Sequence, residues 1–299
     1  MITASAPGKI ILSGEHAVVY GYPALLASVN RRLTVKLTSA PSPTPPRIQL
    51  LIDSCLQSLG VPPARISLAV TSRLPVGAGM GSSAALATAA SAALFYKYRR
   101  TWDLDRINSL AFAAEKIFHG RPSGADNTIS CFGGFLWYRK ESDSFKTFSP
   151  VTGTLPPLLL INSGRPAEST ADMVSRVLAL SHRRPQKTSA VFSRLEAVTR
   201  EWLKIMLGES SAPFSEVIRD NEKLLEMLSI VSPSTQTLIR QIERLGGAAK
   251  ISGAGGFKSA SGLILAYHPR PAVLHRFALD HKLTVLPVKL GGPGVRLNK

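Results

Sequence analysis

The segment that most constrains this chain is LPVGAGMGSSAALATAASAAL, residues 74–94, in which three closely spaced glycines precede a long alanine-rich stretch. Alanine has the highest helix propensity, so the stretch from residue 82 to about residue 100 is predicted to be helical. The run ISLAVTSRL before the glycines alternates as a strand does. Glycine permits positive φ angles and lets the backbone approach a bound group closely. The segment therefore predicts a strand, a tight loop and a helix in succession.

This corner of the chain is suited to binding a phosphate group. Ser82 or Ser83 is expected to cap the first helical turn, whose free N–H groups and positive dipole end attract anions. The loop is not a Walker loop, because no Lys–Ser/Thr pair closes it. A tight turn with no ligand remains an alternative for a glycine loop taken alone.

The length of 299 residues fits one large or two moderate domains. TGTLPP, residues 152–157, is the best candidate boundary, so we expect domains at 1–156 and 157–299. The first half predicts antiparallel strands, helices near 48–59, 82–100 and 104–119, and a hairpin at 134–151. The second predicts strands at 158–162, 261–268 and 284–290, split around helices near 169–183, 187–207, 213–230, 233–245 and 271–282. Strands divided around packed helices indicate an α+β fold.

The net charge is +17, from 36 Lys and Arg against 19 Asp and Glu. The basic residues are scattered, their densest clusters are short, and no nucleic-acid-binding motif accompanies them, so we expect no specific nucleic-acid partner. Cys55 and Cys131 lack metal-ligand spacing, which fits a reducing compartment. No signal-peptide layout and no run of about 20 apolar residues is present, so we expect no membrane segment and a cytoplasmic location.

Polar residues also cluster outside this loop. The clusters are Lys9 in APGK, Glu15-His16 in GEHAVVYG, Asp126 in HGRPSGADN, Ser169-Thr170 at a predicted helix start, and a second glycine run, ISGAGG, at 251–256. Each alone has an ordinary explanation as a surface cation, a turn residue, a helix cap or a turn. Together they supply phosphate loops, a carboxylate and a lysine, which phosphoryl transfer requires.

Glu115 adds a second carboxylate. It lies four residues after Ala111 and three before Phe118, so it is placed beside the apolar stripe of its predicted helix. An acid near a buried face needs a basic partner or a cation. Both possibilities are open from the spacing alone.

Five segments together resemble the mevalonate kinases of the GHMP kinase superfamily. They are APGKIILSGEHAVVYG (6–21), LPVGAGMGSSAA (74–85), EKIFHGRPSGADN (115–127), SGRPAESTADMV (163–174) and KISGAGG (250–256). GSSAA and its preceding glycines are typical of the superfamily, whereas the first and third segments are more specific to mevalonate kinases. The resemblance implies two α+β domains, an N-terminal one like ribosomal protein S5 domain 2 and a C-terminal ferredoxin-like one, with the active site between them.

The resemblance also implies sites for nucleotide and metal. ATP would be bound by Gly77, Ala78, Gly79, Met80, Gly81, Ser82 and Ser83, together with Gly253, Ala254 and Gly255. Ser83 and Glu115 match ligands of Mg²⁺, and both offer the hard oxygen donors that this ion prefers.

By the same resemblance, Asp126 is the base that takes the proton from the C5 hydroxyl of mevalonate, and Lys9 stabilises the charge of Asp126 and of the reacting phosphoryl group. Glu15, His16 and Thr170 match residues that bind or position the acceptor. The product would be 5-phosphomevalonate. Another small-alcohol kinase of the superfamily, or an inactive ATP-binding regulator, remains an alternative, and a homodimer is expected by analogy.

The chain departs from the family pattern after the second glycine run, where Phe257-Lys258-Ser259 replaces further small residues. Lys258 is either an additional phosphate contact or an ordinary loop residue.

Overall fold

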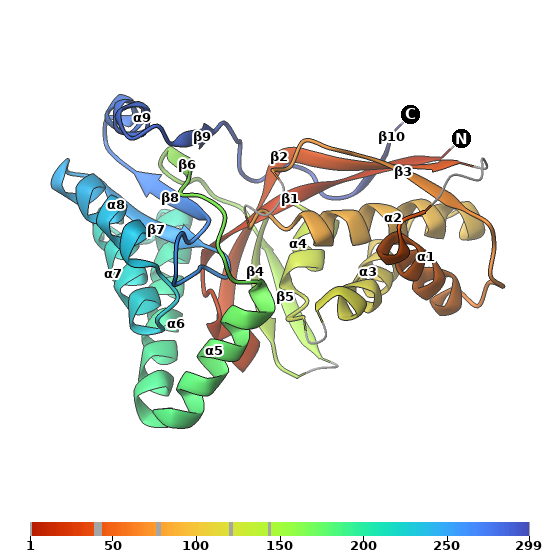
Figure 1. The fold of residues 1–299 in the computed structure, drawn as a ribbon, viewed down its shortest axis with the longest axis horizontal. Coiled ribbons are helices and arrows are strands. Elements are labelled where there is room, and N and C mark those ends of the chain that lie inside the picture. The colour runs from red at the N-terminus through yellow and green to blue at the C-terminus, as the bar shows by residue number, and fades with distance from the viewer. Residues whose placement is uncertain (1, 39–43, 76–78, 120–121, 143–144, 299) are drawn as a thin grey trace.

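The computed structural model describes residues 2–38, 44–75, 79–119, 122–142 and 145–298. It contains two antiparallel sheets with helices packed on them (Figure 1), which confirms the predicted α+β class. None of the described helices combines the length and the apolar character needed to cross a membrane.

The first sheet has the strand order β10-β1-β2-β4-β5, with β3 also paired to β2. Its strands are β1 (Thr3–Ser13), β2 (Pro23–Thr38), β3 (Ser67–Ser72), β4 (Phe135–Lys140), β5 (Lys146–Val151) and β10 (Arg296–Asn298). The short 3-10 helix η1 (Ala17–Tyr20) connects β1 to β2. The helices of this half are α1 (Pro46–Ser58), α2 (Ser82–Arg99), α3 (Leu104–His119) and α4 (Ala125–Phe132), which Figure 1 shows below the sheet.

Helix α2 is the central helix of this half. Its alanines are buried nearly all round, because their small side chains let the helix approach β1, β2 and α3 closely. The helix begins directly after Gly81, which has a φ of 68° and occupies the N-cap position without a side-chain hydrogen bond. The predicted serine cap is therefore wrong: Ser82 and Ser83 are the first helical residues, and a glycine at the cap leaves the N–H groups of the first turn without a hydroxyl acceptor there.

The second sheet has the order β7-β8-β6-β9. Its strands are β6 (Leu158–Asn162), β7 (Ala248–Ser252), β8 (Leu263–Tyr267) and β9 (Thr284–Leu286). Its helices are α5 (Thr170–Arg183), α6 (Pro185–Leu207), α7 (Phe214–Met227), α8 (Pro233–Arg244) and α9 (Pro271–Asp280). The predicted positions of these helices are confirmed within a few residues.

Two strands, β7 and β10, were not predicted. β7 is a short edge strand that the sequence suggested only as the approach to a glycine loop. β10 pairs with β1 through Thr3 and Asn298, so the chain returns at its C-terminal end to the first sheet, and Figure 1 shows both termini on that side. The domain limits at residues 156 and 157 stay a prediction, with β10 contributing to the first sheet.

One hydrophobic core extends across both halves. The largest cluster of buried residues includes Leu12 of β1, Leu94 of α2, Trp202 of α6 and Leu265 of β8. Polar contacts join the halves as well, because the hydroxyls of Ser13 and Thr199 are 2.7 Å apart. The segments that carry the candidate site are therefore held on one continuous scaffold.

Candidate active site

The described ends of the first glycine loop (residues 74–81), at Leu74 and Met80, lie against the middle of β1 at Gly8 and Lys9. Gly77 and Ala78 fall outside the described residues, whereas Gly79 and Gly81 adopt φ angles of 82° and 68°. The backbone N–H of Lys9 donates to the Met80 carbonyl oxygen over 3.0 Å. With a glycine at its cap, the first turn of α2 has no side-chain cap hydrogen bond, and the backbone N–H groups of a helix start are suited to binding an anion.

Gly81 is needed because the Lys9 side chain passes directly beneath it. A Cβ atom at Gly81 would lie 2.8 Å from Cγ of Lys9, closer than side-chain atoms approach one another. Gly81 also requires its positive φ, which residues with a Cβ adopt at a cost. The loop and the lysine are therefore built as one unit.

Lys9 forms an ion pair with Asp126, in which Nζ and Oδ1 are 3.0 Å apart. Lys9 lies within β1, and Asp126 is the second residue of α4. The Lys9 side chain is 5% exposed and that of Asp126 is 37% exposed. The ammonium group is therefore enclosed by the protein, and the carboxylate is partly accessible to solvent.

The chain segment that leads into Asp126 is held in place by Tyr138 of β4. Its hydroxyl donates to the Ser123 carbonyl oxygen over 2.6 Å, and a Cβ atom at Gly124 would lie 2.8 Å from that hydroxyl. Gly124 has a φ of 87° and is the N-cap of α4. This packing sets where α4 begins, and with it the position of Asp126.

Glu115 of α3 and Ser83 of α2 complete the group. Glu115 is only 3% exposed, and its burial raises its pKa to about 8. The nearby charge of Asp126 contributes to this rise as well, while Lys9 and a hydrogen bond from Ser83 oppose it. Side chains from β1, α2, α3 and α4 thus come together at Lys9, Ser83, Glu115 and Asp126, and the roles that the resemblance implies for these residues stay predictions.

This group can hold a divalent cation with help from a substrate. In the described part of the chain, no three His, Cys, Asp or Glu side chains form a metal cluster. Mg²⁺ is usually bound by one or two protein oxygens together with phosphate oxygens and water. A serine hydroxyl next to a buried carboxylate of raised pKa fits that pattern, because a bound cation would stabilise the ionised carboxylate.

The second glycine loop, residues Gly253–Gly256, faces the first. A Cβ atom at Gly79 would lie 3.6 Å from the Ser252 carbonyl oxygen, and one at Gly253 would lie 3.7 Å from that of Gly79. Gly253 and Gly255 have φ angles of 104° and 75°. The loop is anchored at its far end, because Gly256 N–H donates to the Ile230 carbonyl oxygen over 2.9 Å. Two glycine loops distant in sequence therefore form one backbone-lined region.

His16 connects the end of β1 to this second loop. Its Nε2 lies 3.0 Å from the Ala254 carbonyl oxygen. Because a carbonyl oxygen only accepts, Nε2 must carry the proton. Burial lowers the pKa of His16, so the ring is neutral at pH 7 and its Nδ1 is an acceptor. His16 also has a φ of 56°, an uncommon conformation for a residue other than glycine.

Glu15 is completely buried and is ion-paired with Lys250 of β7. Burial raises the pKa of Glu15, and the Lys250 ammonium opposes this shift. Sequence reasoning did not single out Lys250. The signal that could have indicated it is a lysine in the otherwise apolar strand AAKIS, where a charge requires a buried partner.

Comparison with known proteins places this arrangement in a family. A mevalonate kinase of Archaeoglobus fulgidus is 34% identical over 291 residues, covering 89% of this chain and 94% of that protein. The chain belongs to the mevalonate kinase family. The human mevalonate kinase is 27% identical over 100% of this chain and 95% of its own length. Residues 48–134 match the model of the GHMP kinases N terminal domain, a range that includes the first glycine loop, Glu115 and Asp126.

Solved structures of the family share the fold. The structure of L. major mevalonate kinase in complex with R-mevalonate has a TM-score of 0.79 and is 21% identical, covering 97% of this chain and 95% of that one. A phosphomevalonate kinase of Streptococcus pneumoniae superposes with a TM-score of 0.80 at 19% identity, covering 97% of this chain and 100% of the other. The fold therefore does not distinguish between these acceptors.

Among the described residues, no hydrogen bond or ion pair joins Thr170 or Lys258 to this group. Thr170 is exposed at the first position of α5, and among the described residues no hydrogen bond joins it to Lys9 or Asp126. The backbone N–H of Lys258 donates to Oε1 of Glu168 over 3.2 Å, and its ammonium group lies 5.8 Å from the centre of the Phe257 ring. These contacts are those of an ordinary loop residue.

Proposed function

We propose that this protein transfers the γ-phosphoryl group of ATP to the C5 hydroxyl of mevalonate, yielding 5-phosphomevalonate and ADP. The observation that carries the proposal is the Lys9–Asp126 pair, 3.0 Å apart, at the foot of the first glycine loop. Membership of the mevalonate kinase family supports mevalonate as the acceptor.

The reaction is a direct in-line transfer. Asp126, whose carboxylate is partly exposed, accepts the proton of the attacking hydroxyl as its oxygen bonds to phosphorus and the bond to ADP breaks. Lys9 holds Asp126 in place and stabilises negative charge that develops on the transferred group. Phosphate oxygens are bound by the N–H groups of Gly77–Ser83 and of Gly253, Ala254 and Gly255.

Mg²⁺ is part of the proposal. Ser83 and Glu115 would hold the ion, and when bound it neutralises charge on the phosphate oxygens. Glu115 then acts as a carboxylate, and its burial beside α2 fixes the direction in which it points.

The acceptor is proposed to bind near the turn formed by Glu15 and His16. With its Nε2 proton donated to Ala254, a neutral His16 offers Nδ1 as an acceptor for a hydroxyl of mevalonate. Glu15 is fully buried, so its contribution is to fix this turn from behind. Thr170 is retained as a residue that approaches the acceptor when the complex forms. A cytoplasmic location, a homodimer and the absence of nucleic-acid or membrane partners stay predictions.

The proposal is tested by measuring ADP release with mevalonate, phosphomevalonate, homoserine and galactose as acceptors. We expect turnover with mevalonate to exceed that with each of the others by at least about 100-fold in kcat/KM, since a site built to hydrogen-bond one substrate strongly rejects others. Turnover of another acceptor without mevalonate would replace the proposed substrate. ATP binding without turnover of any acceptor would indicate an inactive regulator.

A further inference from the structure

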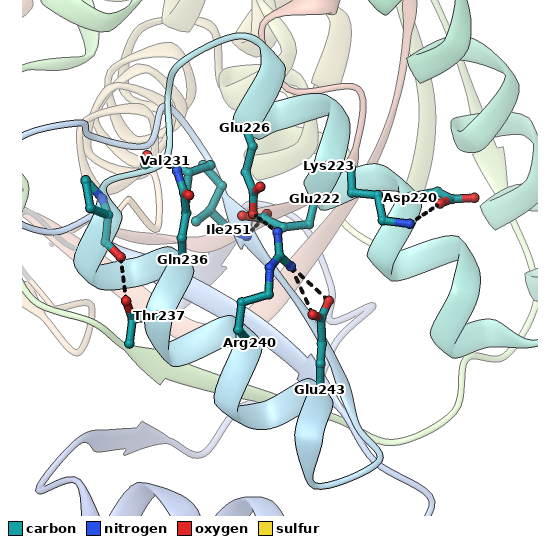
Figure 2. A network of polar contacts seen from close by, with 11 residues as sticks. Asp220, Glu222, Lys223, Glu226, Val231, Gln236, Thr237, Arg240, Glu243 and Ile251 are labelled. Carbon is teal, nitrogen blue, oxygen red and sulfur yellow. Dashed lines mark hydrogen bonds and ion pairs between the residues drawn. The ribbon is translucent and has the colours of Figure 1, made fainter.

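Three ionisable side chains are buried together where the two halves of the molecule meet. Lys250 of β7, Glu15 at the end of β1 and Glu222 of α7 are all completely buried. The Lys250 ammonium donates to Glu15 and, over 2.7 Å, to the Ile251 carbonyl oxygen. Glu222 accepts from the Ile251 N–H over 2.9 Å, as Figure 2 shows. Both polar groups of the Ile251 backbone are therefore held by these side chains.

The strand alternation directs Lys250 toward the first half of the molecule. Side chains in a strand point alternately to opposite faces, and Ala248 belongs to the core shared with the first sheet while Ala249 and Ile251 belong to the core under α7 and α8. Lys250 and Ser252 share the face of Ala248. The Ser252 hydroxyl donates to the Ile11 carbonyl oxygen over 2.9 Å and accepts from its N–H over 3.0 Å.

These contacts lie immediately before the second glycine loop and immediately beside His16. From Lys250 to Ala254, the chain is bound to the first half through Glu15, Ile11 and His16 in succession. The loop that faces Gly79 is thus placed by polar contacts to the same turn that is proposed to bind the acceptor.

Stability alone does not account for a buried lysine here. Replacing a buried ion pair by well-packed apolar residues is often neutral or stabilising, whereas a buried pair does specify one geometry. Burial raises the pKa of both Glu15 and Glu222, which indicates that this cluster costs free energy to maintain.

We infer that Lys250 is a positioning residue for the reaction, which holds the Glu15–His16 turn and the second glycine loop in one fixed arrangement. It touches neither substrate and acts through these two segments. The inference rests on the proposed function, because it assigns ATP to the loop and the acceptor to the turn.

The test compares Lys250→Met, Glu15→Gln and the double variant with wild type. Binding of the non-hydrolysable ATP analogue adenylyl-imidodiphosphate with Mg²⁺ is measured by calorimetry, and kcat and KM are measured with mevalonate. We expect Lys250→Met to weaken nucleotide binding and to lower kcat by about 10- to 100-fold, as small misplacements of reacting groups do. The double variant removes both members of the Lys250–Glu15 ion pair, so neither is left buried without its partner, and Glu222 keeps its hydrogen bond from the Ile251 N–H. We expect the double variant to show the same weakened nucleotide binding and lowered kcat as Lys250→Met, and no larger loss.

Arg240→Met is the matched control. Arg240 of α8 pairs with Glu226 and Glu243 over 2.5 and 3.0 Å in the same half of the molecule (Figure 2), and among the described residues no hydrogen bond or ion pair joins it to either glycine loop. We expect it to lower the melting temperature while nucleotide binding stays within about twofold of wild type.

A double variant that is folded and binds the analogue within about twofold of wild type would overturn the inference, because Lys250 would then only support folding. The calorimetry does not depend on mevalonate. A wild-type protein that binds the analogue but does not phosphorylate mevalonate would overturn the proposed function, while the effect of Lys250→Met on binding would still decide this inference.

Discussion

At the scale of single residues, the candidate site depends on unequal burial of opposite charges. Lys9 is enclosed and Asp126 is partly open, so the cation is fixed and the base is accessible. Glu115, unlike Asp126, is enclosed, and burial raises its pKa to about 8 against the opposing effects of Lys9 and Ser83. This difference in burial is the basis for proposing one carboxylate as the base and the other as a metal ligand.

The metal assignment leads to a prediction for Glu115→Gln. The amide keeps the shape of the side chain but cannot supply a carboxylate to the ion. We expect the Mg²⁺ concentration for half-maximal activity to rise by about 10- to 100-fold. It is measured from initial rates over a Mg²⁺ titration at saturating ATP.

Asp105→Asn serves as the control for that titration, because Asp105 is an exposed acid on the same helix. Its Mg²⁺ dependence should match wild type. If Glu115→Gln also left the dependence unchanged, the residue would not be a metal ligand.

At the scale of elements, two glycines with positive φ allow the cost of backbone strain to be distinguished from an effect on the active site. Gly81 and Gly208 both have positive φ, but a Cβ atom would meet Lys9 at Gly81 and no atom within 4 Å at Gly208. We expect Gly81→Ala and Gly208→Ala each to lose roughly 1–2 kcal/mol of unfolding free energy. Only Gly81→Ala should also lose most of its turnover.

Denaturant unfolding and steady-state kinetics on both variants check this prediction. Equal losses of turnover in the two would show that strain in general, rather than displacement of Lys9, limits activity. Retained turnover in Gly81→Ala would show that the Lys9 side chain adapts.

Helix α7 and strand β7 give a prediction for pH. Burial raises the pKa of Glu222 well above 4.5, against Lys250 and the Ile251 N–H, while Glu226 and Glu15 add to the shift. Between pH 4.5 and that raised pKa, the folded state binds more protons than the unfolded state, so the free energy of unfolding falls as pH rises.

In Glu222→Gln the amide oxygen still accepts from the Ile251 N–H, but this pH dependence is removed. We therefore expect the variant to gain stability relative to wild type between pH 5 and pH 8, as measured by urea unfolding at both values. If the difference in unfolding free energy between Glu222→Gln and wild type were the same at pH 5 and pH 8, the raised pKa of Glu222 would be contradicted.

The long helices could be predicted from the sequence because their signals are local. The alanine run predicts α2, and the apolar spacing from Leu104 to Ala114 predicts α3. β7 has only five residues and contains Lys250, so no alternation identified it. Lys250 and Glu15 are 235 residues apart, and no local pattern reports such a pairing. The predicted serine cap is wrong because the N-cap position has a positive φ, which Gly81 adopts more easily than a serine.

At the scale of the whole molecule, the shared core couples the two sheets. Trp202 of α6 is fully buried in the core that also contains residues of β1 and α2, and its ring lies 4.9 Å from that of Phe214. We expect one cooperative unfolding transition, with coincident curves by tryptophan fluorescence and far-UV circular dichroism. Two separated transitions would show that the halves are stable independently.

The central claim is that Asp126, held by Lys9, is the base that activates the C5 hydroxyl of mevalonate. The most direct test is single-turnover transfer from ATP to mevalonate by Asp126→Asn, with nucleotide affinity measured on the same protein. We expect ATP to bind within about twofold of wild type and transfer to slow by about 10²- to 10⁴-fold. Transfer at close to the wild-type rate would contradict the claim.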